Sequence, residues 1–599
     1  MKKDFINEKV EKAENDAREL WKLLNLLTDK PKSKKIEPDK ITQEKANNFK
    51  KFFATVGSDI QEKLKDKLDK KNYENFDGDY FNFVEEKEET IKKLIKDIDE
   101  KVATGEDNIS AKLIKYCSEI ITPYLTKIIN QGYKTKTFPN ILKKAIIKPI
   151  FKKDDPNDIS NYRPISILSI ISKVFERCAS NQMVNFLIPN DIIHPSQHAY
   201  QKGHSPITCL FEMLNEIYNA VDKRMYVAIA SLDLSKAFDS ISHELLLKKL
   251  SSLGIGNEAI TWIESYLTNR IQKTKFEHFE SEWETVKSGV PQGSILGPLL
   301  FLCFTNDLPK SFEDKCKIFS YADDSQLVVT APNKSEIENK LKIAISTAQS
   351  WYTKNSMLNN TDKTELIIFN PKDKKDELNI EIMDQDKKIT LKSKENIKIL
   401  GLYIDNELKW TKQIKTVKKK SMNTTRRVHR INYFLPKNLR EILYYALISP
   451  HFNFGDIFYG GCNEKDARSL QRVQNFAVKS ITGNRKFDSA SESFKQTKLL
   501  NLKDRRKVHE CVFIHKALQM KSAKNTTKIY QSYRHEASTR QAQSSKLTIP
   551  AHNYSKFKKS PLYRTINTWN QAPKTLPVGN IKLHKNHFQK HLLNKAYPQ

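Results

Sequence analysis

The sequence predicts an α+β protein in which short hydrophobic strands are combined with amphipathic helices. Residues 225–232 form a run of small and β-branched residues, typical of a buried strand, that ends at Asp233. Residues 318–321 and 326–330 predict two further strands around a tight turn with two adjacent aspartates. Other segments carry apolar residues at helical spacing, so we expect a sheet packed against helices.

The charge of the chain indicates a polyanionic partner. Its 599 residues include 102 Lys and Arg and 71 Asp and Glu, a formal net charge of +31. Residues 501–599 hold 20 Lys and Arg against 3 Asp and Glu, so their net charge of +17 is more than half of the surplus. A surplus of this size favours nucleic acid or an acidic membrane surface as the partner.

Cysteine usage and hydropathy favour a reducing compartment. The chain has 7 Cys, an odd number, and no two form a Cys-x-x-Cys pair, which argues against a zinc ribbon or knuckle. The N-terminus runs into charged sequence, so no secretory signal is visible. The longest apolar run, residues 295–304, is broken by Gly-Pro and is shorter than the roughly 20 residues of a membrane span.

The first hundred residues are rich in Lys and Glu. Residues 5–27 and 41–68 carry apolar residues at helical spacing, and a Lys/Pro linker at residues 30–40 separates them. Two amphipathic helices are therefore expected. A solvated helical extension is the simpler interpretation, and contact with RNA is the alternative.

A basic hairpin is expected before the Asp233 strand. Residues 143–153 predict one strand, residues 161–168 predict its partner, and the helices around them start at Asn108 or Ser110, span 120–133 and span 169–187. The hairpin carries Lys143, Lys144, Lys148, Lys152, Lys153 and Arg163. Such a hairpin can hold a triphosphate or a template backbone. The alternative is a solvated edge strand whose lysines prevent aggregation.

Two features follow the Asp233 strand. A helix is predicted over residues 242–253, and Asp233 as a mere helix-start cap is the alternative to a site residue. Residues 289–298 then concentrate three glycines in a chain that has only 16. Glycine lets a backbone approach a ligand closely, so this loop is a candidate binding element, with a simple strand-to-helix turn as the alternative.

The later part of the chain predicts more helix than strand. Helices are expected over 334–357 and 410–435, and strands over 362–369 and 397–405. Residues 411–430 contain eight Lys and Arg and no acid, so one face of that helix suits a phosphate backbone. In the tail, His584, His587 and His591 could share a helical face, but no Cys or acid completes a metal-ligand set.

Asp233, Asp323 and Asp324 lie at predicted strand ends or turns, although they are far apart in sequence. Three such carboxylates can converge at one edge of a sheet and hold two Mg²⁺ ions, with Mn²⁺ as an alternative. Paired ions of this kind can activate a primer 3′-hydroxyl and stabilise a leaving pyrophosphate. The alternative for the adjacent pair is an ordinary Asx turn.

Six blocks in fixed order resemble a known family. They are Asn161-Tyr-Arg-Pro-Ile-Ser, Ser231-Leu-Asp-Leu-Ser-Lys-Ala-Phe-Asp-Ser-Ile, Gly289-Val-Pro-Gln-Gly-Ser-Ile-Leu-Gly-Pro, Tyr321-Ala-Asp-Asp, Asp362-Lys-Thr and Leu400-Gly-Leu-Tyr-Ile-Asp. Together they resemble the reverse transcriptases of non-LTR (LINE-type) retrotransposons, with the jockey and CR1-like groups nearest. The resemblance covers residues 103–481.

The resemblance implies an RNA-directed DNA polymerase with a right-hand fold, which extends a DNA 3′-OH on an RNA template. The implied parts are a helical extension over 1–100, fingers and palm over 101–405 with core motifs over 132–405, a helical thumb over 406–500, and a basic nucleic-acid-binding region over 501–599. RNA template, DNA primer or target and dNTPs would be its partners. No oligomeric state is indicated.

The resemblance also implies roles for single residues. Asp233 and Asp323 would be the main metal ligands, with Asp324 supporting them, and Lys363 a candidate general acid for pyrophosphate. Phe238 would exclude a ribose 2′-hydroxyl. Gln292 and Gly293 would line the nucleotide pocket, and Arg163 and Lys148 would hold the triphosphate. Contact with nucleic acid would come from Lys418, Lys419, Lys420, Arg426 and Arg427.

Two features of the family are missing from the sequence. Few residues precede the polymerase blocks, too few for an upstream endonuclease, and no C-terminal Cys/His knuckle is visible. The resemblance suggests target-primed reverse transcription in the nucleus, with a cytoplasmic ribonucleoprotein stage. The alternatives are a catalytically silent nucleic-acid-binding remnant and a group II intron maturase-like protein, whereas Phe238 disfavours an RNA-copying RNA polymerase.

Overall fold

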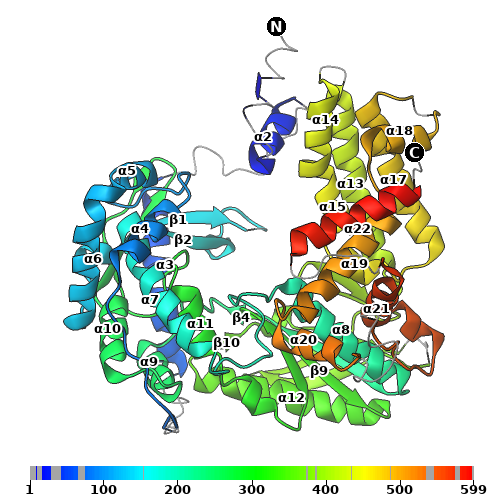
Figure 1. The fold of residues 1–599 in the computed structure, drawn as a ribbon. Coiled ribbons are helices and arrows are strands. Elements are labelled where there is room, and N and C mark those ends of the chain that lie inside the picture. Colours follow the sequence, from blue (N-terminus) through cyan, green and yellow to red (C-terminus); the bar gives the residue numbers. More distant parts are fainter. Residues whose placement is uncertain are drawn as a thin grey trace.

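The computed structural model describes most of the chain as two groups of elements on either side of an antiparallel sheet (Figure 1). The described residues are 8–9, 12, 16–27, 42–64, 75–152, 154–372, 376–384, 387–432, 435–485, 487–534, 546–573 and 580–596. Helices and strands occur together throughout, which confirms the α+β prediction.

The central sheet carries the three predicted carboxylates at one end. Its strands run in the order β11 (Glu365–Phe369), β3 (Tyr226–Leu232), β9 (Asp324–Ala331) and β8 (Lys317–Tyr321), and each neighbouring pair is antiparallel. The last residue of β3 pairs with Ser325, so Asp233 lies beside the turn between β8 and β9. These strands confirm the sequence prediction closely.

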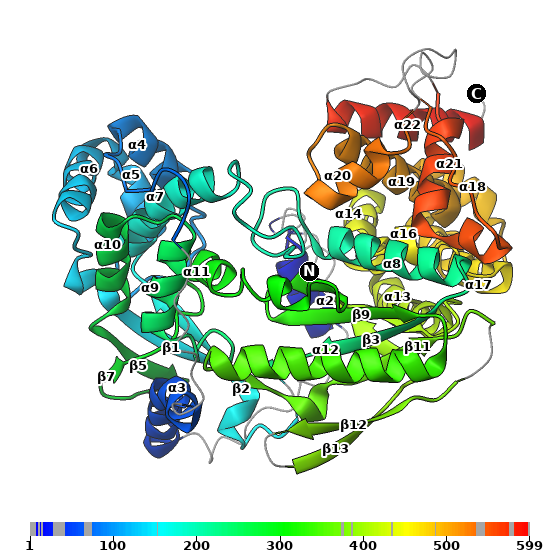
Figure 2. The ribbon, with the colours of Figure 1, turned by 90° about the horizontal axis from the view of Figure 1, so that it is seen from below.

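Helices cover both faces of this sheet. α12 (Lys334–Lys354) shares a core with Ala228 of β3, whereas α8 (Pro206–Asp222) shares a core with Val227. Successive residues of a strand point to opposite faces, so the two helices lie on opposite sides. Figure 2 shows α12 running along the sheet beside β9, β3 and β11.

The first group surrounds a second sheet. Its strands run in the order β2 (Tyr162–Leu168), β1 (Lys144–Phe151), β5 (Arg270–Phe276) and β6 (Phe279–Glu280), and β7 (Glu284–Val286) also pairs with β5. β1 and β2 are the predicted basic hairpin. The helices of this group are α4 (Glu88–Lys96), α5 (Ala111–Tyr116), α6 (Ser118–Lys134), α7 (Ile170–Leu187), α9 (His243–Ser252), α10 (Asn257–Leu267) and α11 (Gly297–Phe304). Ser110, not Asn108, caps α5.

The second group is helical. It contains α13 (Thr411–Ile431), α14 (Lys437–Leu443), the π-helical turn η8 (Tyr444–Ile448), α15 (Ser449–Asn453), α16 (Asp456–Tyr459), α17 (Glu464–Thr482), α18 (Ala490–Thr497), α19 (Leu502–Leu518), α20 (Lys524–Gln531), α21 (Pro561–Gln571) and α22 (Ile581–Ala596). Side chains of α13, α17, α19, α21 and α8 share one hydrophobic core. The last hundred residues are therefore folded against the rest of the protein where the structure describes them.

Short elements join these parts. The two-stranded pairs are β4 (Leu234–Ser235) with β10 (Leu358–Asn359), β12 (Asn379–Asp384) with β13 (Lys387–Lys392), and β14 (Asn396–Ile399) with β15 (Leu402–Asp405). The 3-10 turns are η3 (Asn140–Lys143), η4 (Ile159–Asn161), η5 (Pro309–Phe312), η6 (Thr361–Lys363) and η10 (Ser555–Lys559). The single strand predicted over 397–405 is wrong, because Leu400 and Gly401 take φ values of 44° and 92° and turn the chain back.

The N-terminal helices are not a solvated extension. The predicted helix over 41–68 is described as α3 (Gln43–Leu64), and its Phe49 and Phe53 pack on the basic hairpin and β5. Of the helix predicted over 5–27, the described part is mainly α2 (Ala17–Leu27), which packs beside α13. The predicted linker at 30–40 lies outside the described residues.

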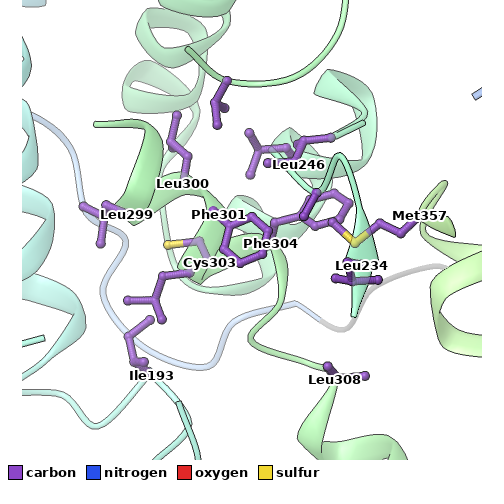
Figure 3. Close-up of a cluster of buried hydrophobic side chains, with 14 of the residues drawn as sticks. Ile193, Leu234, Leu246, Leu299, Leu300, Phe301, Cys303, Phe304, Leu308 and Met357 are labelled. Carbon is purple, nitrogen blue, oxygen red and sulfur yellow. The ribbon is translucent and has the colours of Figure 1, made fainter. Parts of the chain in front are cut away.

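A buried cluster anchors the chain next to Asp233. Leu234 lies in the same hydrophobic core as Leu246 of α9, Phe304 of α11 and Met357. Figure 3 shows Leu234 near the Phe304 and Met357 side chains. Because its immediate neighbour is buried, Asp233 is held at the surface of a packed core.

Three further predictions concern the cysteines, membrane-spanning helices and the tail histidines. All seven cysteines are free, as predicted. In the described parts of the chain, no helix is long and apolar enough to cross a bilayer. The three tail histidines do not converge, because His584 is buried beside His515 and Trp569 while His587 and His591 are exposed.

We expect Phe49→Ala to destabilise the protein, because the Phe49 ring is fully buried against Tyr162 and Phe276. Removing such a ring costs about 3–5 kcal/mol of unfolding free energy, measurable by urea unfolding. The control is Lys51→Ala on the exposed side of the same helix. Equal stability of the two variants would contradict the docking of α3.

Candidate active site

Asp233 is placed by the end of β3 and by a neighbouring lysine. Its backbone carbonyl accepts a hydrogen bond from Asn360 N at 2.8 Å, and its Oδ2 lies 3.1 Å from Lys363 Nζ. The helix that follows is capped instead by the Ser242 side chain. Asp233 is therefore not a helix cap, and its carboxylate faces Lys363 in a half-exposed position.

Asp323 and Asp324 lie at the tip of the β8–β9 hairpin. Tyr321 pairs with Asp324, which leaves Ala322 and Asp323 as a two-residue turn with Ala322 at φ 56°. The four-residue turn predicted over 322–325 is therefore shorter than expected, since β9 begins at Asp324. The tight turn holds both carboxylates next to the end of β3.

The three carboxylates repel one another. Burial raises the pKa of Asp324 to about 6, and the negative charges of Asp323 and Asp233 add to this shift. Burial also raises the pKa of Asp323, and the Asp233 carboxylate contributes. The positive charges of Lys152 and Arg163 act in the opposite direction on both groups. The site thus combines clustered negative charge with basic side chains from the β1–β2 hairpin.

Gln197 holds the β8–β9 hairpin and was not identified from the sequence. Its Oε1 accepts hydrogen bonds from the backbone N of Ala322 and Ala199, each at 3.0 Å, and its Nε2 donates to Ala322 O at 3.3 Å. The side chain is buried. It fixes the residue directly before Asp323, but a single glutamine outside the predicted strands gave no signal of this contact.

The basic side chains of the β1–β2 hairpin differ in their exposure to solvent. Lys148 and Arg163 are on the exposed face, where Lys148 is opposite Ile165 and Arg163 is opposite Ile150. Lys143 is instead buried, so the expectation that it contacts phosphate is wrong. Lys144 Nζ lies 5.5 Å from the Trp283 ring centroid. Lys153 lies outside the described residues.

Phe238 is fixed by stacking. Its ring lies parallel to that of Phe301, with centroids 4.7 Å apart and an interplanar angle of 13°. The ring is half-buried, and the backbone carbonyl accepts a hydrogen bond from Val290 N at 2.9 Å. Phe238 therefore joins the strand end of Asp233 to the Gly-rich loop.

The glycines of the loop at 289–298 let protein backbones meet. A Cβ on Gly289 would lie 2.7 Å from the carbonyl oxygens of Phe238 and Asp239, and one on Gly293 would lie 2.7 Å from Ser166 O. Both residues also have positive φ. The expectation that the glycines make room for a ligand is therefore corrected at these two positions, where they make room for β2 and for the chain after β4.

Gln292 is held by protein contacts at both ends. Its Nε2 donates to the two carboxylate oxygens of Asp239 at 2.9 and 3.0 Å, and its backbone carbonyl accepts from Ser166 N at 2.7 Å. Burial raises the pKa of Asp239 to about 6, against the effect of the Gln292 hydrogen bonds and the Lys236 charge. The loop is thereby tied both to β2 and to the residue after Phe238.

The basic face of α13 is present, with one exception. The apolar side chains Trp410, Ile414, Val417, Val428, Ile431 and Leu435 are buried, as predicted. Lys418, Lys419, Lys420 and Arg426 are exposed. Arg427 is half-buried, donates to Asn25 and lies over the Trp21 ring of α2, so the structure engages it within the protein.

The donor chemistry of the site fits Mg²⁺. Carboxylate oxygens are preferred ligands of this ion, and a divalent cation would offset the burial and the mutual repulsion that raise the pKa of Asp323 and Asp324. Within the described residues, no three His, Cys, Asp or Glu side chains already lie close enough to hold a metal. One oxygen of Asp233, Oδ2, is paired with Lys363 Nζ at 3.1 Å.

We predict that the stability of the protein falls as the pH rises from about 4 to about 6, because the folded state holds the Asp239 proton to a higher pH than the unfolded chain does. The Asp239→Asn variant lacks this proton. Its unfolding free energy relative to wild type should therefore rise over this pH range and level off above it, as measured by urea unfolding.

The matched control is Asp314→Asn, which removes an exposed carboxylate from the loop before β8. Its difference from wild type should stay constant over the same pH range. A constant difference for Asp239→Asn as well would contradict the assignment of this pH dependence to Asp239.

Comparison with known proteins identifies the central region. Residues 150–404 match the family model described as reverse transcriptase (RNA-dependent DNA polymerase). The chain is 26% identical over 412 residues to a protein named as a probable RNA-directed DNA polymerase from transposon BS of Drosophila melanogaster, covering 66% of this chain and 44% of that protein. It is 24% identical over 411 residues to the RNA-directed DNA polymerase from mobile element jockey of the same species, with the same coverage of 66% and 44%.

The jockey polymerase of Drosophila funebris is 28% identical over 288 residues, covering 47% of this chain and 31% of that protein. The chain thus spans less than half the length of these relatives. The resemblance to jockey-type polymerases is confirmed. The matched residues contain all four strands of the sheet that bears the carboxylates, together with β2 and the last two residues of β1, so this part of the chain is similar to the reverse transcriptase family.

Proposed function

We propose that this protein is an RNA-directed DNA polymerase that extends the 3′-OH of a DNA primer on an RNA template. The observation that carries the proposal is the position of Asp233 at the end of β3, beside the turn that bears Asp323 and Asp324, within the electrostatic reach of Lys152 and Arg163. The site lies inside the region that matches the reverse transcriptase family. Clustered acids beside cationic side chains suit the transfer of a nucleotide from the triphosphate to a primer 3′-hydroxyl, with pyrophosphate as the leaving group.

Asp233 and Asp323 would hold two Mg²⁺ ions, with Asp324 in support and Mn²⁺ as a substitute. Bound there, the ions would lower the pKa of the primer hydroxyl and neutralise charge on the leaving pyrophosphate. Lys363, whose Nζ lies beside Asp233, would give a proton to the pyrophosphate. Arg163 and Lys148 project from the exposed face of the basic hairpin and would bind the triphosphate oxygens.

Nucleotide selection would depend on Phe238 and on the shape of the loop behind it. The Phe301 ring prevents Phe238 from retreating, so a ribose 2′-hydroxyl would meet a fixed aromatic edge. Gln292 and Gly293 would shape the nucleotide pocket by keeping the loop against Ser166. Both residues would act by positioning this loop, because the Gln292 side chain is already hydrogen-bonded to Asp239.

The parts of a right-hand polymerase can be assigned to the observed groups. The first group would form the fingers, the central sheet with α12 and α8 the palm, and α13 with its neighbours the thumb. The exposed basic residues Lys418, Lys419, Lys420 and Arg426 of α13 would follow the primer–template backbone. Target-primed synthesis in the nucleus, after a cytoplasmic ribonucleoprotein stage, is the setting that this activity suggests.

Primer extension on an RNA template with Mg²⁺ and dNTPs tests the proposal. Asp323→Ala should reduce extension by at least about a thousandfold, because one metal ligand is lost, while primer–template binding stays within about twofold. Asp314→Ala, which removes an exposed carboxylate before the same hairpin, should extend like wild type.

A folded wild-type protein that binds primer–template but does not extend it would favour the alternative of a silent nucleic-acid-binding remnant. Extension that survives in Asp323→Ala would contradict the assigned metal site. Stimulation of intron splicing without extension would favour the maturase-like alternative.

We expect Phe238→Val to accept ribonucleotides. Loss of the ring should lower the preference for dNTP over rNTP, expressed as the ratio of kcat/KM values, by about tenfold or more. Phe301→Leu should lower the ratio less than Phe238→Val does, because it removes the stacking partner but keeps the Phe238 ring. An unchanged ratio in Phe238→Val would show that another group reads the sugar.

A further inference from the structure

We propose that helix α20 of the C-terminal region positions the β8–β9 hairpin, hereafter the catalytic hairpin, through the buried carboxylate of Glu212. This inference rests on the proposed polymerase function and gives the region after residue 501 a role beyond its charge. α20 contacts α8 on one side, and α8 contacts β8 of the hairpin on the other. The last hundred residues therefore reach the active site through one intervening helix.

Glu212 is held from two directions. Its Oε1 accepts hydrogen bonds from Thr526 N at 2.8 Å and from Thr526 Oγ1 at 2.7 Å. Its Oε2 lies 3.3 Å from His198 Nε2. All three residues are buried. A buried carboxylate must be satisfied by such partners, so the position of Glu212 depends on α20. Among the described residues, His198 Nε2 contacts Glu212 without a hydrogen bond, and His198 Nδ1 lies 3.0 Å from Thr208 Oγ1 of α8, so Glu212 and Thr208 together position the His198 ring.

His198 belongs to the segment that clasps the hairpin. Its backbone N donates to Ser320 O at 2.8 Å, and Ser320 N donates to Ser196 O at 2.9 Å. Gln197 lies between Ser196 and His198 in the chain, and its side chain forms hydrogen bonds with the backbone N and O of Ala322. A displacement of His198 would therefore move the backbone that carries Asp323.

Other contacts keep the C-terminal region on α8 without using Glu212. The rings of Phe211 and Tyr530 stack with centroids 5.3 Å apart. The Asp222 carboxylate accepts hydrogen bonds from the backbone N of Asn553 and Tyr554. Because these contacts remain, removing the Thr526 hydroxyl should loosen the link to the hairpin and leave the region docked.

The test compares Thr526→Val with Thr527→Val in the full chain. Both threonines are buried on the same helix, but the Thr527 hydroxyl finds no hydrogen-bond partner among the described residues. Thr526→Val should lower kcat for extension by about tenfold, while KM for dNTP and primer–template affinity stay within about twofold. Thr527→Val should match wild type, and Thr526→Ser should restore kcat.

A second readout does not depend on activity. Backbone amides of Ser320 and Ala322 donate to the segment at 196–197, so hydrogen–deuterium exchange reports how firmly the hairpin is held. Exchange at these amides should be about tenfold faster in Thr526→Val than in wild type or Thr527→Val. Glu212→Gln, which removes the buried charge, should shift it in the same direction.

The outcomes separate this inference from the proposed function. If wild type fails to extend a primer, the proposed function is wrong, and the exchange rates alone decide the positioning role of α20. If wild type extends but Thr526→Val leaves both kcat and the exchange at Ser320 and Ala322 unchanged, α20 does not position the hairpin. Equal effects of Thr526→Val and Thr527→Val would also overturn the inference, because the hydrogen bond to Glu212 would then be irrelevant.

Discussion

Antiparallel pairing of β3 with β9 is the constraint on which the rest of the structure depends. It brings Asp233 beside Asp323 and Asp324, and the three negative charges would drive the strand ends apart if nothing opposed them. The contacts that oppose this repulsion include hydrogen bonds and hydrophobic packing as well as positive charge. Gln197 clamps the turn, Leu234 is buried in the core beside α11, and the sheet is covered by α12 and α8 on its two faces.

Backbone geometry determines which basic side chains are exposed and which are buried, as it does for apolar side chains. Alternation along β1 and β2 sends Lys148 and Arg163 to one face, whereas Lys143 at the start of the hairpin is buried. On α13, helical periodicity exposes a cluster at 418–420 but directs Arg427 to α2. A count of lysines and arginines therefore overstates the charge available to a nucleic acid, and the fold decides which of them can reach a phosphate.

Elements with strong local patterns could be predicted from the sequence, and contacts between distant segments could not. The strands β3, β8 and β9 follow from short runs of apolar, aromatic and β-branched residues, and the buried face of α13 follows from its period. The turn at Leu400 was missed because leucine rarely adopts positive φ, although the neighbouring Gly401 was a signal for a turn. The docking of α3 could not be inferred, since Phe49 and Phe53 at helical spacing suit a free amphipathic helix as well. The candidate acids were found because carboxylates at strand ends are conspicuous, whereas Gln197 and Glu212 act through partners far away in the chain.

The cover that the last hundred residues place over α8 has a genetic consequence. A premature stop codon near residue 501 would keep every block of the polymerase reading frame, yet it would expose Phe211 to water and strip Glu212 and Asp222 of the partners that satisfy them. Truncated gene copies of this kind would encode a protein in which α8 still covers the sheet but is itself exposed on its outer side. Selection for polymerase activity would then extend to the codons for residues 526–554, well beyond the codons for the acids themselves.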